Sequence, residues 1–188
     1  MAKRLWRIFF IFILMIFLGT FSALAVGPAT VYKVTLTKFE LWNGTAWITI
    51  LDGSSTTIDI ASASSGAAAG NFISGVNIPD GTYTQSRVTP SATFTIKGND
   101  GSNYTTAAIG VGSGCTATEI AASAAECTVT IPGGITANTA IFSGPITMTG
   151  GVASHKVRVS FDVSTAIQTV VGELFPAAPT VTVTIIQL

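Results

Sequence analysis

The stretch VTLTKFELWNGTAWITIL, residues 34–51, holds two short apolar runs that Asn43-Gly44 separates. Asn and Gly both tolerate positive φ, so this dipeptide between alternating apolar runs is a strong signal for a β-hairpin. The apolar positions of the first run change phase at Thr37-Lys38, between Leu36 and Phe39. One extra residue that shifts the phase in this way indicates a β-bulge. The stretch therefore predicts two antiparallel strands, the first of them bulged.

Apolar residues also alternate with polar ones in later stretches, as expected for half-buried strands. Gly, Pro, Asn and Asp punctuate the chain at short intervals, and no stretch after residue 25 keeps a helical period for three turns. The best helical candidate, residues 118–126, is short and Ala-rich. We therefore expect an all-β fold, a two-sheet antiparallel β-sandwich of about seven to ten strands, in one domain over residues 26–188. The alternating apolar sets are Phe94 and Ile96; Val157, Val159, Phe161 and Val163; and Val181, Val183 and Ile185.

The N-terminus has the three parts of a secretory signal peptide. Basic residues at 3, 4 and 7 precede an apolar run from Ile8 to Leu18, and Ala23-Leu24-Ala25 supplies the small residues of a cleavage site. We expect residues 1–25 to form a signal helix that is cleaved, so that the protein is secreted, extracellular or at the cell surface. In the alternative, without cleavage, residues 8–25 just reach the length of a spanning helix.

Charge and composition exclude some partners. After residue 25 the chain has 6 basic and 9 acidic residues, a net charge of −3, which favours neither nucleic acid nor an anionic membrane. Thr occupies 27 of those positions, and it suits the wet face of a sheet in place of charge. Low charge also means little repulsion between copies. We expect no nucleic-acid partner, and no membrane partner once the signal peptide is removed.

Residues 34–88 resemble a family of exported bacterial domains of unknown function with an immunoglobulin-like or prealbumin-like sandwich. The matching residues are VTLTKFEL at 34–41, Trp47, IDI at 58–60 and VNIPDGTYTQSRV at 76–88. Physically, the Pro-x-Gly-x-Tyr element is a turn feeding a strand whose Tyr83 packs over the end of the sandwich. The resemblance covers about a third of the exported chain. It implies an exported β-sandwich and brings no catalytic residues with it.

Cysteine and histidine usage gives no catalytic site. Cys115 and Cys127 are the only cysteines, and in an exported protein such a pair indicates a disulfide. His155 is the only histidine and no Gly-x-Ser-x-Gly motif occurs, so a Ser-His-acid nucleophile is not expected. The glycine-rich loop at 110–114 lacks the Lys and the helix of a phosphate loop, so we interpret it as a flexible loop. We therefore expect no enzyme, no catalytic residues and no cofactor.

Two weaker ligand sites stay open. Asn99, Asp100, Ser102 and Asn103 offer hard oxygens around Gly101 that suit calcium, although Asn-Asp-Gly is first of all a turn sequence. Trp42, Trp47 or Tyr104 could stack on a carbohydrate. Trp42 and Trp47 flank the same hairpin, so we expect one of them, Trp47, in the core.

The chain is strand-like almost to both ends. Residues 181–188 end without a polar tail, and the last 32 positions contain no Lys, the residue most used to blunt exposed edges. Either terminus could therefore dock in its own sheet or add to the edge of a neighbour. We expect a structural protein that binds copies of itself through an assembly strand at Val181, Val183 and Ile185, in a filament or surface layer. The alternative is a monomeric extracellular module that binds carbohydrate or another surface ligand.

Overall fold

The computed structural model describes residues 25–63, 70 and 77–187. The predicted signal peptide, residues 1–25, therefore lies outside the described residues except for Ala25. The predicted all-β fold is confirmed: the described residues contain strands and one short 3-10 turn, η1 (Ala121–Ser123), where the helical candidate was expected. Every strand pairing is antiparallel. The strands form four sheets rather than the expected two.

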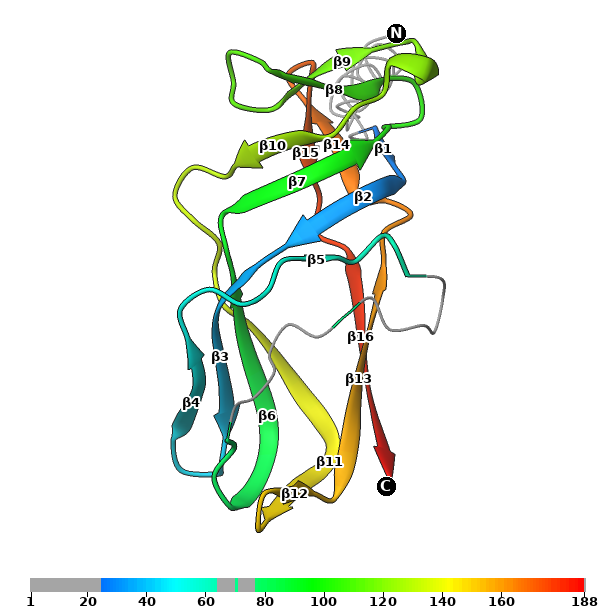
Figure 1. Cartoon of the computed structure of the whole chain (residues 1–188). Coiled ribbons are helices and arrows are strands. Elements are labelled where there is room, and N and C mark those ends of the chain that lie inside the picture. The colour runs from blue at the N-terminus through cyan, green and yellow to red at the C-terminus, as the bar shows by residue number, and fades with distance from the viewer. Residues whose placement is uncertain (1–24, 64–69, 71–76, 188) are drawn as a thin grey trace, which may run out of the picture.

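The four sheets, named A to D, lie in two pairs at opposite ends of the molecule (Figure 1). Sheets A and B face each other at one end, and sheets C and D form the other end. Sheet A orders β1 (Val26–Gly27), β14 (Ile167–Val170), β15 (Glu173–Pro176), β9 (Cys115–Thr118) and β8 (Tyr104–Ile109). Sheet B orders β10 (Cys127–Thr130), β7 (Thr93–Gly98), β2 (Ala29–Val34) and β5 (Ile58–Asp59). Sheet C orders β12 (Val152–Ala153), β11 (Asn138–Thr149), β6 (Gly81–Pro90), β3 (Leu36–Trp42) and β4 (Trp47–Asp52); sheet D pairs β13 (His155–Asp162) with β16 (Thr180–Gln187).

The predicted hairpin is β3 and β4. Residues 43–46 join the strands, and Trp42 pairs with Trp47. The Asn43 side chain accepts hydrogen bonds from the amides of Thr45 and Ala46 at 2.9 and 2.8 Å. Gly44 has φ of +92°, which an L side chain rarely adopts. The Asn-Gly signal therefore marks an Asx turn in a four-residue loop, and the β3–β6 register shifts just before Lys38, where the sequence predicts a bulge.

Two strands bend from sheet C into sheet B, which explains why the fold has more sheets than expected. β3 follows β2 after Thr35 alone, and β7 follows β6 after Ser91-Ala92. The amide of Ser91 donates to the carbonyl of Thr35 at 2.7 Å, so both strands change sheet at the same level. The alternation of apolar and polar residues continues through such a bend, so sequence periodicity locates the strand but does not show that it passes from one sheet to another.

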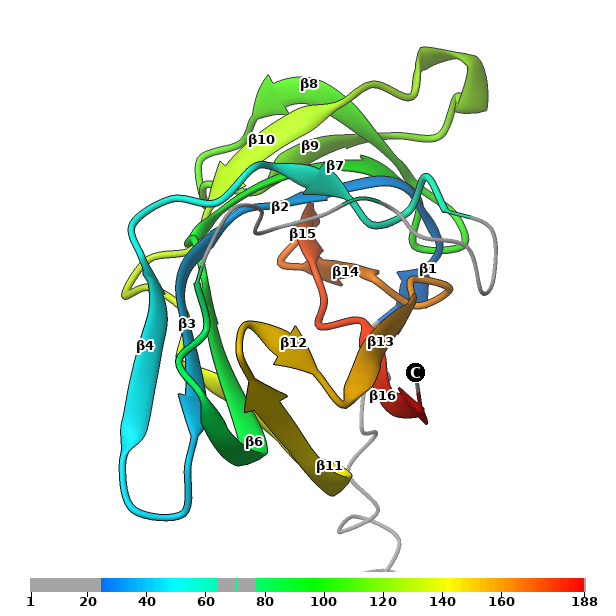
Figure 2. The same cartoon turned by 60° about the horizontal axis from the view of Figure 1, so that its bottom comes forward.

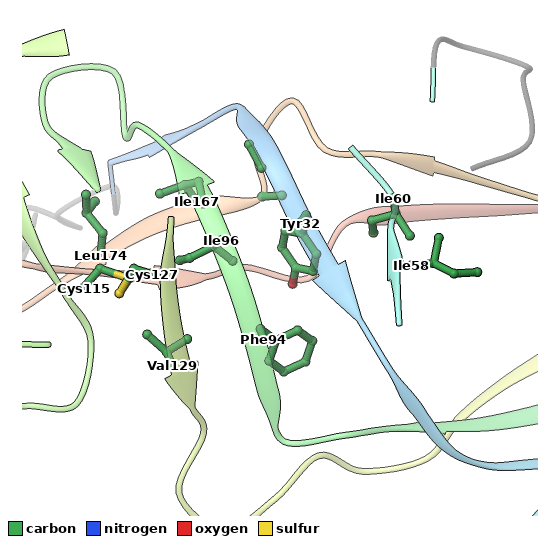
Figure 3. Close-up of a cluster of buried hydrophobic side chains, with 12 residues drawn as sticks. Tyr32, Ile58, Ile60, Phe94, Ile96, Cys115, Cys127, Val129, Ile167 and Leu174 are labelled. Carbon is green, nitrogen blue, oxygen red and sulfur yellow. A yellow bond between two sulfur atoms is a disulfide. The ribbon is translucent and has the colours of Figure 1, made fainter. Parts of the chain in front are cut away.

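Two hydrophobic cores result. Core 1 lies between sheets A and B, and the disulfide crosses it beside Leu174 and Ile96 (Figure 3). The predicted Cys115–Cys127 disulfide is confirmed, and it joins β9 of sheet A to β10 of sheet B. Core 2 lies under sheet C and includes Tyr83, which is 2% exposed. The buried members of core 2 are Leu41, Tyr83, Phe142, Ile146 and Met148; those of core 1 are Ala29, Tyr32, Ile58, Ile60, Phe94, Ile96, Cys115, Cys127, Val129, Ala166, Ile167 and Leu174.

The start of β2 passes very close to the end of β7. A Cβ on Gly98 would lie 2.3 Å from the carbonyl oxygen of Pro28, closer than any real contact of this type. The side chain of Thr105 completes this crossing, because it accepts a hydrogen bond from the Gly98 amide at 3.2 Å and donates one to the Ala125 carbonyl at 2.8 Å. Glycine is thus required at position 98 because the backbone at Pro28 passes too close for a side chain. The buried hydroxyl of Thr105 provides hydrogen-bond partners for the Gly98 amide and the Ala125 carbonyl.

Candidate functional site

Sheet D is a two-stranded ribbon that carries the predicted assembly strand. β13 and β16 pair over their whole length, from His155 opposite Gln187 to Asp162 opposite Thr180. This register puts the alternating apolar residues of both strands on one face, because directly opposite residues point the same way. The apolar cross-strand pairs are Val157 with Ile185, Val159 with Val183 and Phe161 with Val181.

Other strands cover the apolar face of the ribbon only in part. Val183 and Ile185 pack against core 2, but Val181 is 44% exposed and Val159 is 46% exposed. Within the described residues no strand pairs with the second edge of β16. Figure 2 shows sheet C curving from β4 through β3 and β6 to β11, with the narrow ribbon on the other side. The five strands of sheet C thus face only the two strands of sheet D.

An apolar groove opens where sheets B, C and D meet. Its volume is about 1020 Å³. Val181, Val183, Val159 and Phe161 form the side that belongs to the ribbon. Sheet C contributes Phe39, Ser86, Val88 and residues 138–141, and sheet B contributes Tyr32 and Phe94. The same side chains that leave the ribbon half exposed therefore line a hollow of the size that protein interiors normally fill.

The N-terminal strands are integrated in their own sheets. β2 lies between β7 and β5, and its Tyr32 is 3% exposed in core 1. The phenol of Tyr32 donates a hydrogen bond to the carbonyl of Ala177 at 2.9 Å. β1 pairs with β14, and the carbonyl of Ala25 accepts from the amide of Thr169 at 3.1 Å. Both N-terminal strands thus pair within their own sheets, which leaves β16 as the assembly candidate of the two termini.

The expected core position of Trp47 is wrong. Trp42 and Trp47 lie directly opposite each other with ring centroids 5.4 Å apart, and both are partly buried outside the two cores. They share the face of β3 and β4 opposite to Leu41, because side chains alternate along a strand. The guanidinium of Arg87 lies 4.3 Å from the ring centroid of Trp47 and covers it.

A buried carboxylate lies beside this tryptophan pair. Glu40 is 4% exposed and accepts a hydrogen bond from Arg87 Nε at 2.7 Å, while Lys38 Nζ lies 3.0 Å from its other oxygen. The hydrogen bond from Arg87 holds the pKa of the Glu40 carboxyl below its usual value, against the opposing effect of burial. The charged groups are therefore mutually satisfied. Among the described residues a cation covers the ring of Trp47 but not that of Trp42.

Tyr104 does not join the tryptophans. It lies in β8 of sheet A, opposite Thr118, and is partly buried, whereas Trp42 lies in sheet C. The structure thus separates the two residues that the sequence suggests as stacking platforms.

The oxygen-rich stretch at 99–103 forms the β7–β8 turn. Asp100 is 6% exposed and accepts hydrogen bonds from the amides of Ser102 and Asn103 at 2.9 and 2.7 Å, and from the hydroxyl of Thr169. Asn99 accepts from the Gly101 amide in the same way. Burial alone would raise the pKa of the Asp100 carboxyl, but these hydrogen bonds outweigh it and lower the pKa to about 2. Of the four side chains proposed for calcium, Asn99 and Asp100 thus accept hydrogen bonds from the protein's own donors.

The glycine-rich loop at 110–114 binds the carboxylate of Glu173, a residue of the same chain. The amides of Gly112 and Gly114 each donate to the Glu173 carboxylate at 2.8 Å. A Cβ on Gly110 would lie 2.2 Å from that carboxylate. The loop is therefore anchored to β15 rather than merely flexible. Sequence analysis missed Glu173 because 59 residues separate it from Gly114 and no local pattern connects them.

The described residues offer few other groups for catalysis or metal binding. The Nδ1 of His155 lies 2.8 Å from the hydroxyl of Ser154. Among these residues, no three His, Cys, Asp or Glu side chains lie close enough together to hold a metal ion. No helix within the described ranges is long and apolar enough to cross a membrane.

Comparisons of this chain with protein-family models, with curated proteins and with solved structures give no match.

Proposed function

We propose that this protein is an exported structural protein without enzymatic activity, and that its copies associate through the C-terminal strand β16. The observation that carries the proposal is the second edge of β16, which has no partner strand among the described residues. An unpaired edge presents a row of free backbone donors and acceptors, and these are a template for a strand of another chain. The half-exposed valines of the ribbon give such a contact an apolar contribution.

The chain leaves this edge unprotected. Natural proteins blunt exposed edges with lysine, proline or inward-pointing charge, but residues 180–187 contain none of these. Such an edge is tolerable where association is the purpose of the protein. The proposed location is outside the cell or on its surface, in a filament or a layer, after removal of residues 1–25. The sandwich is proposed to be of the immunoglobulin-like or prealbumin-like type that residues 34–88 resemble.

Electron microscopy of the purified exported protein tests this proposal. The full chain is expressed with its leader, and mass spectrometry of the product establishes the N-terminus, which is expected near Val26. Negative-stain images should show regular oligomers, fibres or sheets. A field of separate particles of single-chain size, at every concentration tried, would contradict the proposal.

The second candidate is a carbohydrate-binding module, and the tryptophan pair on sheet C favours it. Trp42 and Trp47 place two indole rings side by side away from the cores, with Arg87 and Glu40 beside them. Aromatic faces with polar neighbours are suited to sugar rings. Titration with soluble oligosaccharides should then change the tryptophan fluorescence, and Trp42→Ala should abolish the change. An unchanged spectrum across a broad oligosaccharide panel would exclude this second function.

A further inference from the structure

The free edge of β16 differs in charge from the outer strands β13 and β4. Residues 180–187 carry no charge. The free edge of β13, on the other side of the same ribbon, contains Lys156, Arg158 and Asp162. The outer strand of sheet C, β4, ends in Asp52. Because closely opposed like charges oppose edge-to-edge pairing, β16 is the one of these three edges on which a second strand meets the least electrostatic resistance. The outer strands β8 and β10 are also uncharged, so the choice of β16 rests in addition on its sequence.

The sequence of β16 is also complementary to itself. If two copies pair antiparallel about Val183, then Val183 lies opposite Val183 of the second copy. Val181 lies opposite Ile185, and Thr182 lies opposite Thr184. From Val181 to Ile185, apolar residues then meet apolar residues on one face and the two threonines meet on the other, because directly opposite residues share a face. Beyond this segment Thr180 lies opposite Ile186.

This fold already uses threonine pairs of this kind. Between β7 and β10, Thr95 lies opposite Thr128 and their hydroxyls are 2.8 Å apart. Thr93 and Thr130 pair in the same way at 3.1 Å. The same cross-strand hydrogen bonds are available to Thr182 and Thr184 on the exposed face of β16.

We propose that two copies of this chain form an isologous dimer in which their β16 strands pair antiparallel about Val183, as a four-stranded sheet ordered β13-β16-β16-β13. Val181, which is 44% exposed in the single chain, then packs beside Ile185 of the second copy. The inference rests on the proposed function and names its contact surface. An isologous contact closes after two copies. A filament or layer is therefore built from dimers and needs a second, different contact to grow.

Charge pairing across the two-fold axis tests the register. The variant Thr182→Lys/Thr184→Lys puts lysine opposite lysine twice in the proposed dimer, and Thr182→Glu/Thr184→Glu does the same with glutamate. Both positions are exposed, but Thr184 lies opposite Arg158 of the same chain, so circular dichroism checks that each variant, and the lysine variant above all, keeps its fold. The matched control is Thr128→Lys/Thr130→Lys, which changes two exposed threonines at the same spacing on the edge strand β10. Sedimentation velocity measures the mass of each protein, expressed as the full chain with its leader.

The natural protein and the β10 control should sediment at twice the mass of one chain, or at multiples of that dimer. Each charged β16 variant alone should fall to the mass of one chain, a twofold loss. An equimolar mixture of the lysine and glutamate variants should return to twice that mass, because lysine then faces glutamate. Assemblies that survive both β16 variants, or that only the β10 variant dissociates, would overturn the β16 dimer and leave self-association standing. A natural protein of single-chain mass at all concentrations would overturn both proposals.

Discussion

Replacing Thr105 with valine should destabilise this protein, although it makes the interior more apolar. The Thr105 side chain is fully buried. Its hydroxyl donates to the Ala125 carbonyl at 2.8 Å and accepts from the Gly98 amide at 3.2 Å. Valine has nearly the same shape and no hydroxyl, so it fills the space and leaves both backbone groups without their partner.

The size of the effect follows from those two groups. A buried donor or acceptor left unsatisfied costs about 1–3 kcal/mol. Two such groups cost about 4 kcal/mol at the middle of that range, and the added methyl group returns about 1 kcal/mol of transfer free energy. We therefore expect Thr105→Val to lower the free energy of unfolding by about 3 kcal/mol.

Thr105→Ser is the matched control, because it keeps the hydroxyl and loses only a buried methyl group. It should cost about 1 kcal/mol, as small deletions in cores do. Urea unfolding of both variants, with the disulfide intact, measures the two free energies. The reasoning would be refuted by a valine variant that is at least as stable as the serine variant.

Three further predictions concern stability. Asp100 has a folded-state pKa of about 2 against about 3.9 when unfolded, so the stability that its charge contributes is complete above about pH 4 and is lost as the pH falls toward 2. Unfolding curves across that pH window should therefore show a smaller loss of stability for Asp100→Asn than for the natural protein, and equal losses would contradict this. Cys115→Ser/Cys127→Ser should lower the free energy of unfolding by about 3 kcal/mol for a loop of this length, and reductant should destabilise only the natural protein; an effect of reductant on both would count against the disulfide's role. Gly98→Ala should cost about 1–3 kcal/mol by overpacking against Pro28, whereas Gly144→Ala, which meets nothing within 4 Å, should change the unfolding midpoint little; equal effects would argue against the close approach.

Local patterns predicted the strands of this fold well. The alternation of β13 and β16, the Asn43-Gly44 hairpin and the bulge before Lys38 all depend on neighbours in sequence, so periodicity and turn chemistry capture them. The disulfide was also predictable, because the chain contains only two cysteines. These features require no knowledge of how the sheets pack.

The features that sequence analysis missed are long-range. Trp47 was expected in the core because it flanks the same hairpin as Trp42, but both rings lie on the opposite face of sheet C, where Arg87 covers Trp47. The phase of β4 relative to β3 decides that face, and two bulges alter the phase within one hairpin and its neighbour. Glu173 reaches the glycine-rich loop across sheet A. Each of these contacts depends on sheet order, which a single sequence does not contain.

The candidate assembly site was predicted in part. Val181, Val183 and Ile185 were recognised as one face of a terminal strand, and β16 has that alternation. The open edge beside them could not be foreseen, because it depends on sheet D having two strands where sheet C has five. The groove of about 1020 Å³ along the ribbon is likewise a product of sheet packing.

The most direct test of self-association is the mass of the purified exported protein at sedimentation equilibrium, over a wide range of concentration, in low and high salt and with and without calcium. A contact made by backbone hydrogen bonds and apolar side chains is screened little by salt, unlike one made by surface ion pairs. The account predicts a mass above that of one chain that persists in high salt and does not require calcium. A mass of one chain at the highest concentration, in every buffer, would contradict it.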